Sequence, residues 1–457
     1  MSGEIFTRTT RIARPAAEVF AWHERPGALA RLCPPWERVE IVAASGGIRD
    51  GARVKVRSKV GPLWLVWDVV HRDFRAGEQF RDVQERGPFA QWEHLHRVQA
   101  DGPGACLLTD EIRYRLPGGA VGQLLAGGGV RRKLERMFAW RHATTQADVE
   151  RAAQLGAMSP RRIVIAGASG LLGRALGPFL QTQGHTVVRL VRRPARDEGE
   201  ISWDPARGEL DAAALAGADA IINLAGENVG EGRWTTARRE AILRSRVDAT
   251  RTLVLALKKL ARKPEVLVNA SAIGFYGDCG EAVIGEDAPV GQGFLPEVCL
   301  AWETHAEGAA RLGMRTALLR LGVVLTPAGG ALAKMLPALR AGLGGPLGGG
   351  RQWMSWVSID DAVDAIYRAV LDPRWSGAAN ITAPHPVTNA EFTATLGRVL
   401  RRPAVLPVPG WVLRAAFGQM ADEALLASTR AVPARLQAMG YEFRHPTMEA
   451  ALRHLLP

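Results

Sequence analysis

The stretch RRIVIAGASGLLGRALGPFLQTQGHTVVRLVRRP, residues 161–194, decides the fold of the larger part of this chain. It holds an apolar β-branched run, a Gly-x-x-Gly-x-x-Gly turn, an amphipathic segment ending at Gly184, and a second apolar run over 186–191. A strand, a glycine turn, a helix and a second strand in this order predict a βαβ unit. The glycines allow close backbone approach, so that the helix N-terminus can face a pyrophosphate with free amides and its positive dipole end. The stretch therefore predicts a dinucleotide-binding turn.

The residues after the second apolar run bear on the choice of cofactor. An NAD-preferring site usually has an acid there for the ribose hydroxyls, whereas this chain has Arg192 and Arg193. Their guanidinium groups would pair with the 2′-phosphate of NADP, and Ser169 in the turn could assist. Two arginines that merely cap a strand in solvent are the alternative. We expect NADP, with NAD as the second choice.

Strand and helix patterns continue to alternate along the chain, which predicts a doubly wound parallel sheet with ligands at the carboxyl ends of its strands. The expected elements are a strand over 218–226, a helix over 235–261, a strand over 265–273, a helix over 299–313 and a strand over 315–325. The predicted cofactor-binding residues are Gly167, Ser169, Gly170, Leu171, Leu172, Gly173, Arg192, Arg193, Leu224, Ala225, Gly226 and Arg320.

The chain before residue 158 has a different pattern of residues. Runs of β-forming residues separated by Gly and Pro predict an antiparallel meander, and a long helical segment over 121–154 follows it. The sequence Met158-Ser-Pro, where the pattern changes, resembles a former translation start retained where two genes were fused. We expect three domains, over 1–153, 160–403 and 404–457.

The first part of the chain resembles the START-like, polyketide-cyclase-like (SRPBCC) superfamily, which has the helix-grip fold. The resemblance includes the progression F…WEH.H…G…L.DEI.Y.LPGG. It runs through Phe89, Trp92, His94, His96, Asp110, Tyr114, Leu116 and Pro117. The resemblance implies an apolar or amphipathic small-molecule ligand held between sheet and helix. The large aromatics are candidates for a cavity lining, although plain core is the favoured interpretation for most of them. These are Trp64, Trp67, Trp92, Phe138 and Trp140.

Two histidines of this progression, His94 and His96, stand two apart on one face of a predicted strand. A metal pair is one interpretation. No third ligand is evident in the sequence, so we interpret them as paired surface histidines and predict no metal site. The scattered Cys33, Cys106, Cys279 and Cys299 also argue against a zinc site or a disulfide framework.

Ordered motifs from about residue 161 to 456 resemble the atypical extended short-chain dehydrogenase/reductase family labelled NAD-dependent epimerase. They include GASGLLG, INLAGENVGEGRW, NASAIGFYG, LRLGVVLTPAGGAL and WVSIDD. The segment from about 404 onward resembles the family's small C-terminal helical domain. The resemblance implies a Rossmann fold and chemistry on a small carbonyl or hydroxyl compound.

The usual catalytic dyad of that superfamily is missing. A tyrosine is normally followed four residues later by a lysine, whose charge favours the phenolate at neutral pH. The residues four places after Tyr114, Tyr276, Tyr367 and Tyr441 are Gly118, Gly280, Leu371 and His445. The predicted catalytic residues are therefore Ser271 as hydroxyl donor, Tyr276 as proton donor and Glu303 as replacement acid or base, with Glu286 as a weaker candidate.

Two functional classes fit these residues. One is an NADP-dependent oxidoreductase or epimerase acting on a small molecule, with an apolar ligand in the first domain. The other is a sensor that binds NADP without turning it over. Ser271 could instead cap its strand, Tyr276 could be core, and Glu303 could face solvent.

Charge and hydropathy limit the other classes. The chain has a formal net charge of +12, but its arginines are mostly single and lie among acids, so we expect no nucleic-acid partner. No apolar run approaches the roughly 20 residues that a membrane span requires. The first residues lack the apolar core of a secretory signal, and the expected location is cytoplasmic.

Overall fold

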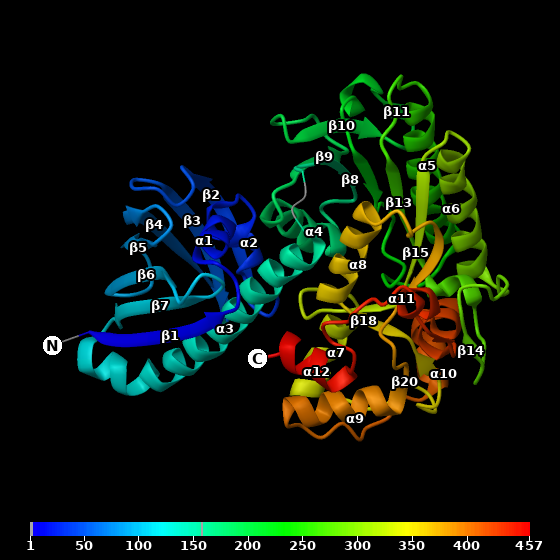
Figure 1. The fold of residues 1–457 in the computed structure, drawn as a ribbon. Helices are drawn as coiled ribbons and strands as arrows, with labels where there is room; N and C mark the ends of the chain where they lie inside the picture. The colour runs from blue at the N-terminus through cyan, green and yellow to red at the C-terminus, as the bar shows by residue number, and fades with distance from the viewer. Residues whose placement is uncertain (1–2, 157–158) are drawn as a thin grey trace. The chain divides into compact units, whose positions relative to one another are not determined.

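The structure is a computed structural model that describes residues 3–156 and 159–457 (Figure 1). Its contacts divide the chain into two units. Unit 1 comprises Met1–Pro160 with Pro178–His185 and Pro457, and unit 2 comprises Arg161–Gly177 and Thr186–Leu456. Met158, where we predicted a fusion joint, lies outside the described residues, and the expected domain boundaries remain predictions.

Unit 1 is built on an antiparallel sheet with the strand order β1-β7-β6-β5-β4-β3-β2. Its strands are β1 (Glu4–Ile12), β2 (Val39–Ser45), β3 (Arg53–Val60), β4 (Leu63–Arg75), β5 (Gln79–Arg86), β6 (Gln91–Ala100) and β7 (Cys106–Arg115). The helices are α1 (Ala16–Glu24), α2 (Ala28–Arg31) and the long α3 (Gly119–Leu155). β7 alternates buried and less buried residues, as a strand with one covered face does.

The long helix α3 covers that face of the sheet. Leu134 and Phe138 of α3 pack with Phe6, Ile112 and Tyr114 of the strands. A second apolar cluster forms where α1 meets the sheet. A sheet bent against one long helix is the predicted helix-grip arrangement.

Unit 2 is built on a sheet with the strand order β11-β10-β9-β8-β12-β13-β15-β19, in which only the β10–β11 pair is antiparallel. Its strands are β8 (Arg162–Ala166), β9 (Thr186–Val191), β10 (Glu200–Asp204), β11 (Glu209–Leu210), β12 (Ala220–Asn223), β13 (Val266–Ala272), β15 (Arg315–Leu321) and β19 (Gly377–Ile381). The larger helices are α4 (Leu171–Thr182), α5 (Thr236–Lys258), α6 (Phe294–Ala310), α7 (Gly330–Arg340) and α8 (Ile359–Leu371). In Figure 1, α5 and α6 lie on one side of the sheet, and α4 and α8 lie on the other.

The central strands are apolar on both faces because helices cover both. Val164 and Ile221 point toward α5 and α6, whereas their neighbours Ile163 and Ile165 are buried on the other side. Strand β8 pairs with β9 on one edge and with β12 on the other. Strand order reverses at β8, and open α/β sheets bind ligands in the crevice at the carboxyl ends of the strands beside such a reversal.

The C-terminal segment groups with unit 2. Its helices are α9 (Asn389–Leu400), α10 (Gly410–Phe417), α11 (Ala434–Ala438) and α12 (Met448–Leu455). The short pair of β14 (Val283–Ile284) with β21 (Arg430–Ala431) joins it to the rest. Two further short pairs, β16 (Val323–Leu325) with β18 (Trp356–Ser358) and β17 (Trp353–Met354) with β20 (Val387–Thr388), lie before α9. Leu452 and Leu455 of α12 share one core with Trp356 and Leu336.

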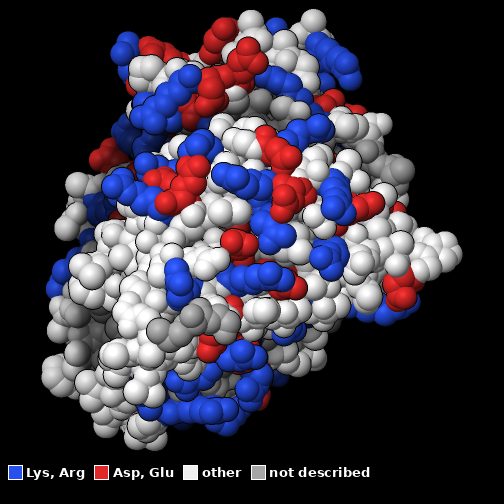
Figure 2. Space-filling model, turned by 90° about the vertical axis from the view of Figure 1, so that its left-hand side faces the viewer, with Lys and Arg blue, Asp and Glu red and all other residues white. Residues whose placement is uncertain are grey.

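Charges of both signs are mixed on the face drawn in Figure 2, where Lys and Arg side chains lie beside Asp and Glu side chains over much of the surface. No helix within residues 3–156 and 159–457 combines the length and the apolar character that a membrane crossing requires.

The predicted fold class is confirmed for both units. The prediction was incomplete at the sheet edges, where β10 and β19 were not foreseen. One prediction was wrong: His94 and His96 are not surface histidines, because only 3% and 8% of their respective surfaces are exposed. They lie on the face of β6 that α3 covers. The sequence alone did not show which residues contact them there.

Candidate functional site

The glycine turn after β8 has the close contacts that the sequence predicted. Gly167 has a φ of +79°, and a Cβ there would lie 2.6 Å from the Leu224 carbonyl carbon. At Gly173 a Cβ would lie 2.4 Å from the Gly167 oxygen and 2.5 Å from the Ala168 Cα. Side chains cannot fit at either position without moving backbone. Helix α4 begins directly after the turn at Leu171, so its first amides face the crevice.

Ser169 and Gly170 are exposed at the tip of this turn, as a site that approaches a ligand requires. Leu171 and Leu172 are partly buried at the start of α4. The turn thus offers open backbone toward the crevice and apolar side chains toward the core.

The two arginines after β9 differ in their surroundings. Arg193 donates two hydrogen bonds of 2.7 Å to Glu200, from Nη1 to Oε2 and from Nη2 to Oε1. Hydrogen bonding from Arg193 lowers the pKa of the Glu200 carboxyl to about 2. Arg192 is exposed and forms no hydrogen bond or ion pair with any other residue that the structure describes. Arg192 is therefore the guanidinium that is available to an anion.

The segment Leu224–Gly226 follows β12 and borders the same crevice. Asn223, just before it, is fully buried and donates a hydrogen bond of 2.7 Å to Asn269 at the end of β13. A Cβ at Gly226 would lie 3.0 Å from Cζ of Arg246, so this guanidinium lies directly beside the segment. Arg246 comes from α5, and the motif search in the sequence missed it.

The three predicted catalytic residues share one buried network. Ser271 Oγ, at the end of β13, donates a hydrogen bond of 2.6 Å to Glu303 Oε1 on α6. Glu303 also accepts from Arg320 of β15, at 2.9 Å from Nε and at 2.8 Å from Nη2. All three side chains are buried. Adjacent positions of β13 and β15 bring Ser271 and Arg320 together, because these residues are paired in the sheet.

Tyr276 joins this network through its hydroxyl. The phenol donates to Asn380 Oδ1 at 2.7 Å and accepts from Arg320 Nη1 at 2.9 Å. Burial raises the pKa of Tyr276, although Arg320 and Asn380 oppose this shift, so the phenol stays protonated near neutral pH. Burial also opposes the charge on Arg320, but hydrogen bonds and attraction from Glu303 outweigh it and raise the pKa of the guanidinium.

Arg320, which was predicted to contact the cofactor, lies among the catalytic candidates, and its role at the cofactor stays a prediction. Its guanidinium stacks 3.5 Å from the centre of the Phe275 ring. The weaker candidate Glu286 is also buried, but its Oε1 accepts backbone N–H groups from Asn380 and Arg435. Those bonds make Glu286 a structural carboxylate.

A thiol that the sequence reasoning passed over lies beside Ser271. Cys299 stands one helical turn before Glu303 on α6, at the four-residue spacing of the missing tyrosine and lysine. Its surface is 3% exposed, and burial with the nearby Glu303 charge raises the pKa of the thiol to about 11. Helix α6 thus carries a neutral thiol and a carboxylate four residues apart. The spacing was visible in the sequence, but a search for Tyr and Lys alone could not find it.

One surface pocket lies at the outer edge strand β19 and is lined in part by Arg374, Trp375 and Arg435. None of the predicted site residues lines it. The predicted site residues lie instead at the carboxyl ends of β8, β12, β13 and β15, where the glycine turn and the network of Ser271, Glu303 and Arg320 are found.

Comparison with known proteins places these motifs in a family. The model of the NAD dependent epimerase/dehydratase family matches residues 163–381. An epimerase family protein of Mycobacterium bovis is 44% identical over 290 residues, which are 64% of this chain and 96% of that protein. The human epimerase family protein SDR39U1 is 36% identical over 301 residues, 65% of this chain and 99% of the relative. The chain belongs to the epimerase family.

This epimerase-family chain carries two further matched regions. Residues 4–144 match the family described as polyketide cyclase / dehydrase and lipid transport, and residues 408–455 match a domain of unknown function, DUF1731. The predicted fusion of a START-like domain with an atypical short-chain dehydrogenase/reductase is therefore confirmed.

Solved structures agree with this assignment. A Corynebacterium glutamicum protein described as a nucleoside-diphosphate sugar epimerase has a TM-score of 0.80 and 33% identity, covering 98% of this chain and 90% of that one. Human SDR39U1 (isoform 2), solved with NADPH, has a TM-score of 0.59 and 34% identity, covering 64% of this chain and 98% of that one.

The buried Glu303–Arg320 pair generates a stability prediction. Replacing Glu303 with Gln should destabilise unit 2 by about 3–5 kcal/mol, because it leaves the Arg320 charge buried without a counter-charge. Ser271→Ala should cost only about 1 kcal/mol, since it removes one hydrogen bond and leaves the ion pair intact. Chemical denaturation of both variants measures the difference, and equal effects would contradict the assigned role of the ion pair.

Proposed function

We propose that this chain is an NADP-dependent oxidoreductase or epimerase that acts on a small carbonyl or hydroxyl compound. The observation that carries the proposal is that the dinucleotide turn and Ser271, with its partner Glu303, lie at the carboxyl ends of β8 and β13, two parallel strands separated by β12 in one sheet. Unit 1 is proposed to bind an apolar ligand, in keeping with its resemblance to lipid-transport proteins.

Several groups support NADP as the cofactor. Exposed Arg192 and Ser169 stand at the two places where a 2′-phosphate would need partners. Gly167 and Gly173 keep the turn free of side chains where a pyrophosphate would approach. Human SDR39U1, which was solved with NADPH, covers this part of the chain. NAD remains the second candidate.

The residues support a definite path for the proton. When bound, NADP would accept or supply the hydride. For oxidation of an alcohol, the substrate hydroxyl gives its proton to Ser271 Oγ while the Ser271 proton moves to Glu303 Oε1, which already accepts that hydrogen bond. Reduction of a carbonyl follows the same steps in reverse. Arg320 holds the Glu303 carboxylate in place, and Tyr276 fixes Arg320.

The network also favours a second candidate function. In this structure Ser271, Tyr276 and Glu303 each form hydrogen bonds within the protein, and all three are buried. A network that satisfies its own groups, in a chain without the usual dyad, suits a sensor that binds NADP without turnover.

Arg192 provides a test of cofactor choice. Arg192→Ala should weaken NADPH binding by roughly tenfold, because it removes a charge-assisted bond to the 2′-phosphate, and should leave NADH binding unchanged. Arg196→Ala, a change of another exposed arginine in the same loop, is the matched control. Fluorescence titration measures both affinities, and an equal loss for NADPH and NADH would contradict the assignment.

A turnover assay separates the two proposed functions. The purified chain is mixed with NADPH and a panel of aldehydes and ketones, or with NADP⁺ and a panel of nucleoside-diphosphate sugars, and the absorbance of NADPH is followed. Sugar stereochemistry is read by NMR, since an epimerase regenerates its cofactor. An enzyme should lose at least about 100-fold in rate in the Ser271→Ala, Tyr276→Phe double variant.

The matched control is Glu307→Gln, which changes an exposed carboxyl one turn after Glu303 on α6. It should keep the full rate. NADPH binding with no conversion of any compound in the panel would favour the sensor, and undiminished turnover by the double variant would refute the proton path.

A further inference from the structure

A cluster of histidines and aspartates lies inside unit 1, which contains none of the predicted site residues. It lies on the face of the sheet that α3 covers, and helix residues join it from outside the sheet. The strand residues are His71 on β4, Asp82 on β5, His94 and His96 on β6, and Asp110 on β7; His23 comes from α1 and His142 from α3. The sequence analysis treated only two of these residues as a pair.

Strand register explains why these side chains converge. Asp82 is paired with His94 on one side and with His71 on the other. His96 is paired directly with Asp110. Paired residues on one face of an antiparallel sheet have neighbouring side chains. The four adjacent strands β4 to β7 therefore bring these polar side chains together.

Three of these residues have ligand atoms close enough to share one ion. Asp82, His94 and His96 each offer one ligand atom, and these atoms lie within 4.8 Å of one another. Asp82 Oδ2 is 3.3 Å from His96 Nε2 and 3.8 Å from His94 Nδ1. Two ligands bound about 2.0–2.1 Å from zinc at tetrahedral angles would lie roughly 3.4 Å apart. The separations are therefore near those of a coordination shell, and 3.8 Å is too long for a hydrogen bond.

The remaining ring nitrogens have the partners that metal-bound histidines usually have. His94 Nε2 lies 2.8 Å from Asp110 Oδ1, and His96 Nδ1 lies 2.7 Å from the same oxygen. Histidines that bind a metal commonly donate their second N–H to a carboxylate, which fixes the tautomer and turns the other nitrogen toward the ion. His142 Nε2 in turn holds Asp110 Oδ2 at 2.6 Å.

Aromatic contacts fix the orientation of both rings. Phe80 stacks on His96 with ring centres 4.2 Å apart, and Phe138 meets His94 edge-on at 5.1 Å. Rigid side chains reduce the entropy that would be lost when an ion binds.

A further observation points to a missing partner in the cluster. His71 Nδ1 is buried and forms no hydrogen bond with other described residues, whereas His71 Nε2 lies 2.9 Å from Asp82 Oδ1. Buried polar atoms are rarely left unpaired. The Asp82 side chain as a whole keeps 23% of its surface exposed, which gives an ion access from solvent.

From this geometry we propose that unit 1 holds a divalent first-row transition metal ion bound by Asp82, His94 and His96. Asp110 orients both imidazoles, and the charges of the two aspartates balance that of the ion. Two imidazoles and one carboxylate are ligands that zinc and iron(II) accept, and three protein ligands leave positions open for water or a small molecule. The site would thus give the apolar interior of unit 1 a polar anchor for a ligand.

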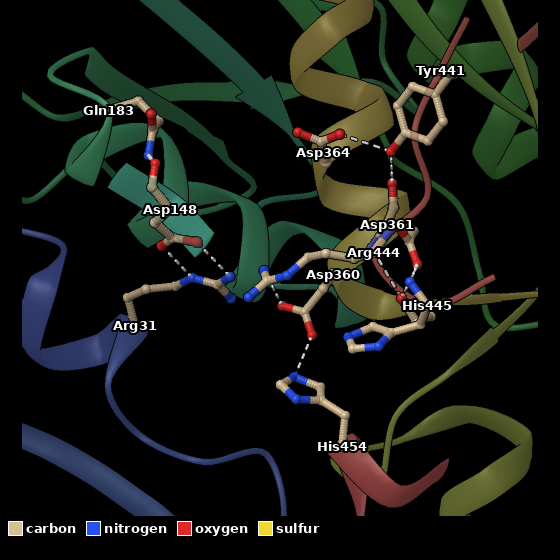
Figure 3. Close-up of polar contacts among 11 residues, drawn as sticks. Arg31, Asp148, Gln183, Asp360, Asp361, Asp364, Tyr441, Arg444, His445 and His454 are labelled. Carbon is tan, nitrogen blue, oxygen red and sulfur yellow. Dashed lines mark hydrogen bonds and ion pairs between the residues drawn. The ribbon is translucent and has the colours of Figure 1, made fainter. Parts of the chain in front are cut away.

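A second group of similar composition, Asp360, His445 and His454, lies in unit 2 and is drawn in Figure 3. His454 Nε2 is 3.1 Å from Asp360 Oδ2, and Arg444 Nη1 is 3.7 Å from Asp360 Oδ1. A guanidinium beside the carboxylate opposes binding of a cation by charge repulsion. This group is the natural control for the proposed site.

The test uses the full chain, first freed of metals with a chelator. Titration with Zn²⁺ should show one tight site per chain by calorimetry and elemental analysis, and Zn²⁺ should raise the melting temperature of unit 1. Co²⁺ in the same site should give visible d–d absorption. Asp82→Asn and His96→Gln should abolish tight binding, and Asp110→Asn should weaken it by about 10–100-fold.

The control His454→Gln should bind Zn²⁺ as the unaltered chain does. Because an altered cluster could unfold, circular dichroism is recorded for each variant, and the Zn²⁺-dependent rise in melting temperature of the unaltered chain stands as an independent readout. A chain that binds no Zn²⁺ and is not stabilised by it, or one that loses its ion in His454→Gln, overturns the proposal. The cluster is then a hydrogen-bonded network of histidines and aspartates.

Discussion

The close approach of backbone at Gly167 and Gly173 is the constraint on which the functional half of the molecule depends. Because neither residue has a side chain, Gly167 packs closely against the Leu224 carbonyl, and Gly173 packs closely against the Gly167 oxygen. That packing fixes where α4 begins and leaves Ser169 and Gly170 exposed at the crevice. The strand order around β8 then brings the ends of β12, β13 and β15 to the same edge. The position of the glycine turn and the position of the candidate catalytic residues therefore both depend on how β8 and its turn pack in the sheet.

The electrostatics of the site differ from those of the usual dyad. A lysine beside a tyrosine favours a phenolate, whereas this chain pairs a carboxylate with a guanidinium and leaves the phenol of Tyr276 protonated. In the proposed proton path the base is the carboxylate of Glu303, and Ser271 is the group through which it acts. Loss of the dyad does not by itself mean loss of proton transfer, since a buried and oriented carboxylate can perform the same step.

Much of this could be predicted from sequence, for physical reasons that differ by element. The βαβ unit was readable because a glycine turn between two apolar runs has few alternatives, and β8, α4 and β9 lie where expected. β10 and β19 were missed because short edge strands carry little hydrophobic pattern. Ser271, Tyr276 and Glu303 were chosen by residue type. That Arg320 binds both Glu303 and Tyr276 beside Ser271 depends on strand register, which one sequence does not display. The same limit made His94 and His96 look like surface residues, because Asp82 and Asp110 reach them only across the sheet.

The central claim is that the glycine turn binds NADP through backbone that a side chain would block. Calorimetric titration of NADPH into the full chain, Gly173→Ala and Gly177→Ala tests it most directly, since both glycines stand in α4 and only a Cβ at Gly173 meets backbone. We predict binding by the full chain and by Gly177→Ala, and at least a tenfold loss in Gly173→Ala. No heat with the full chain, or equal affinity in all three proteins, would contradict the account.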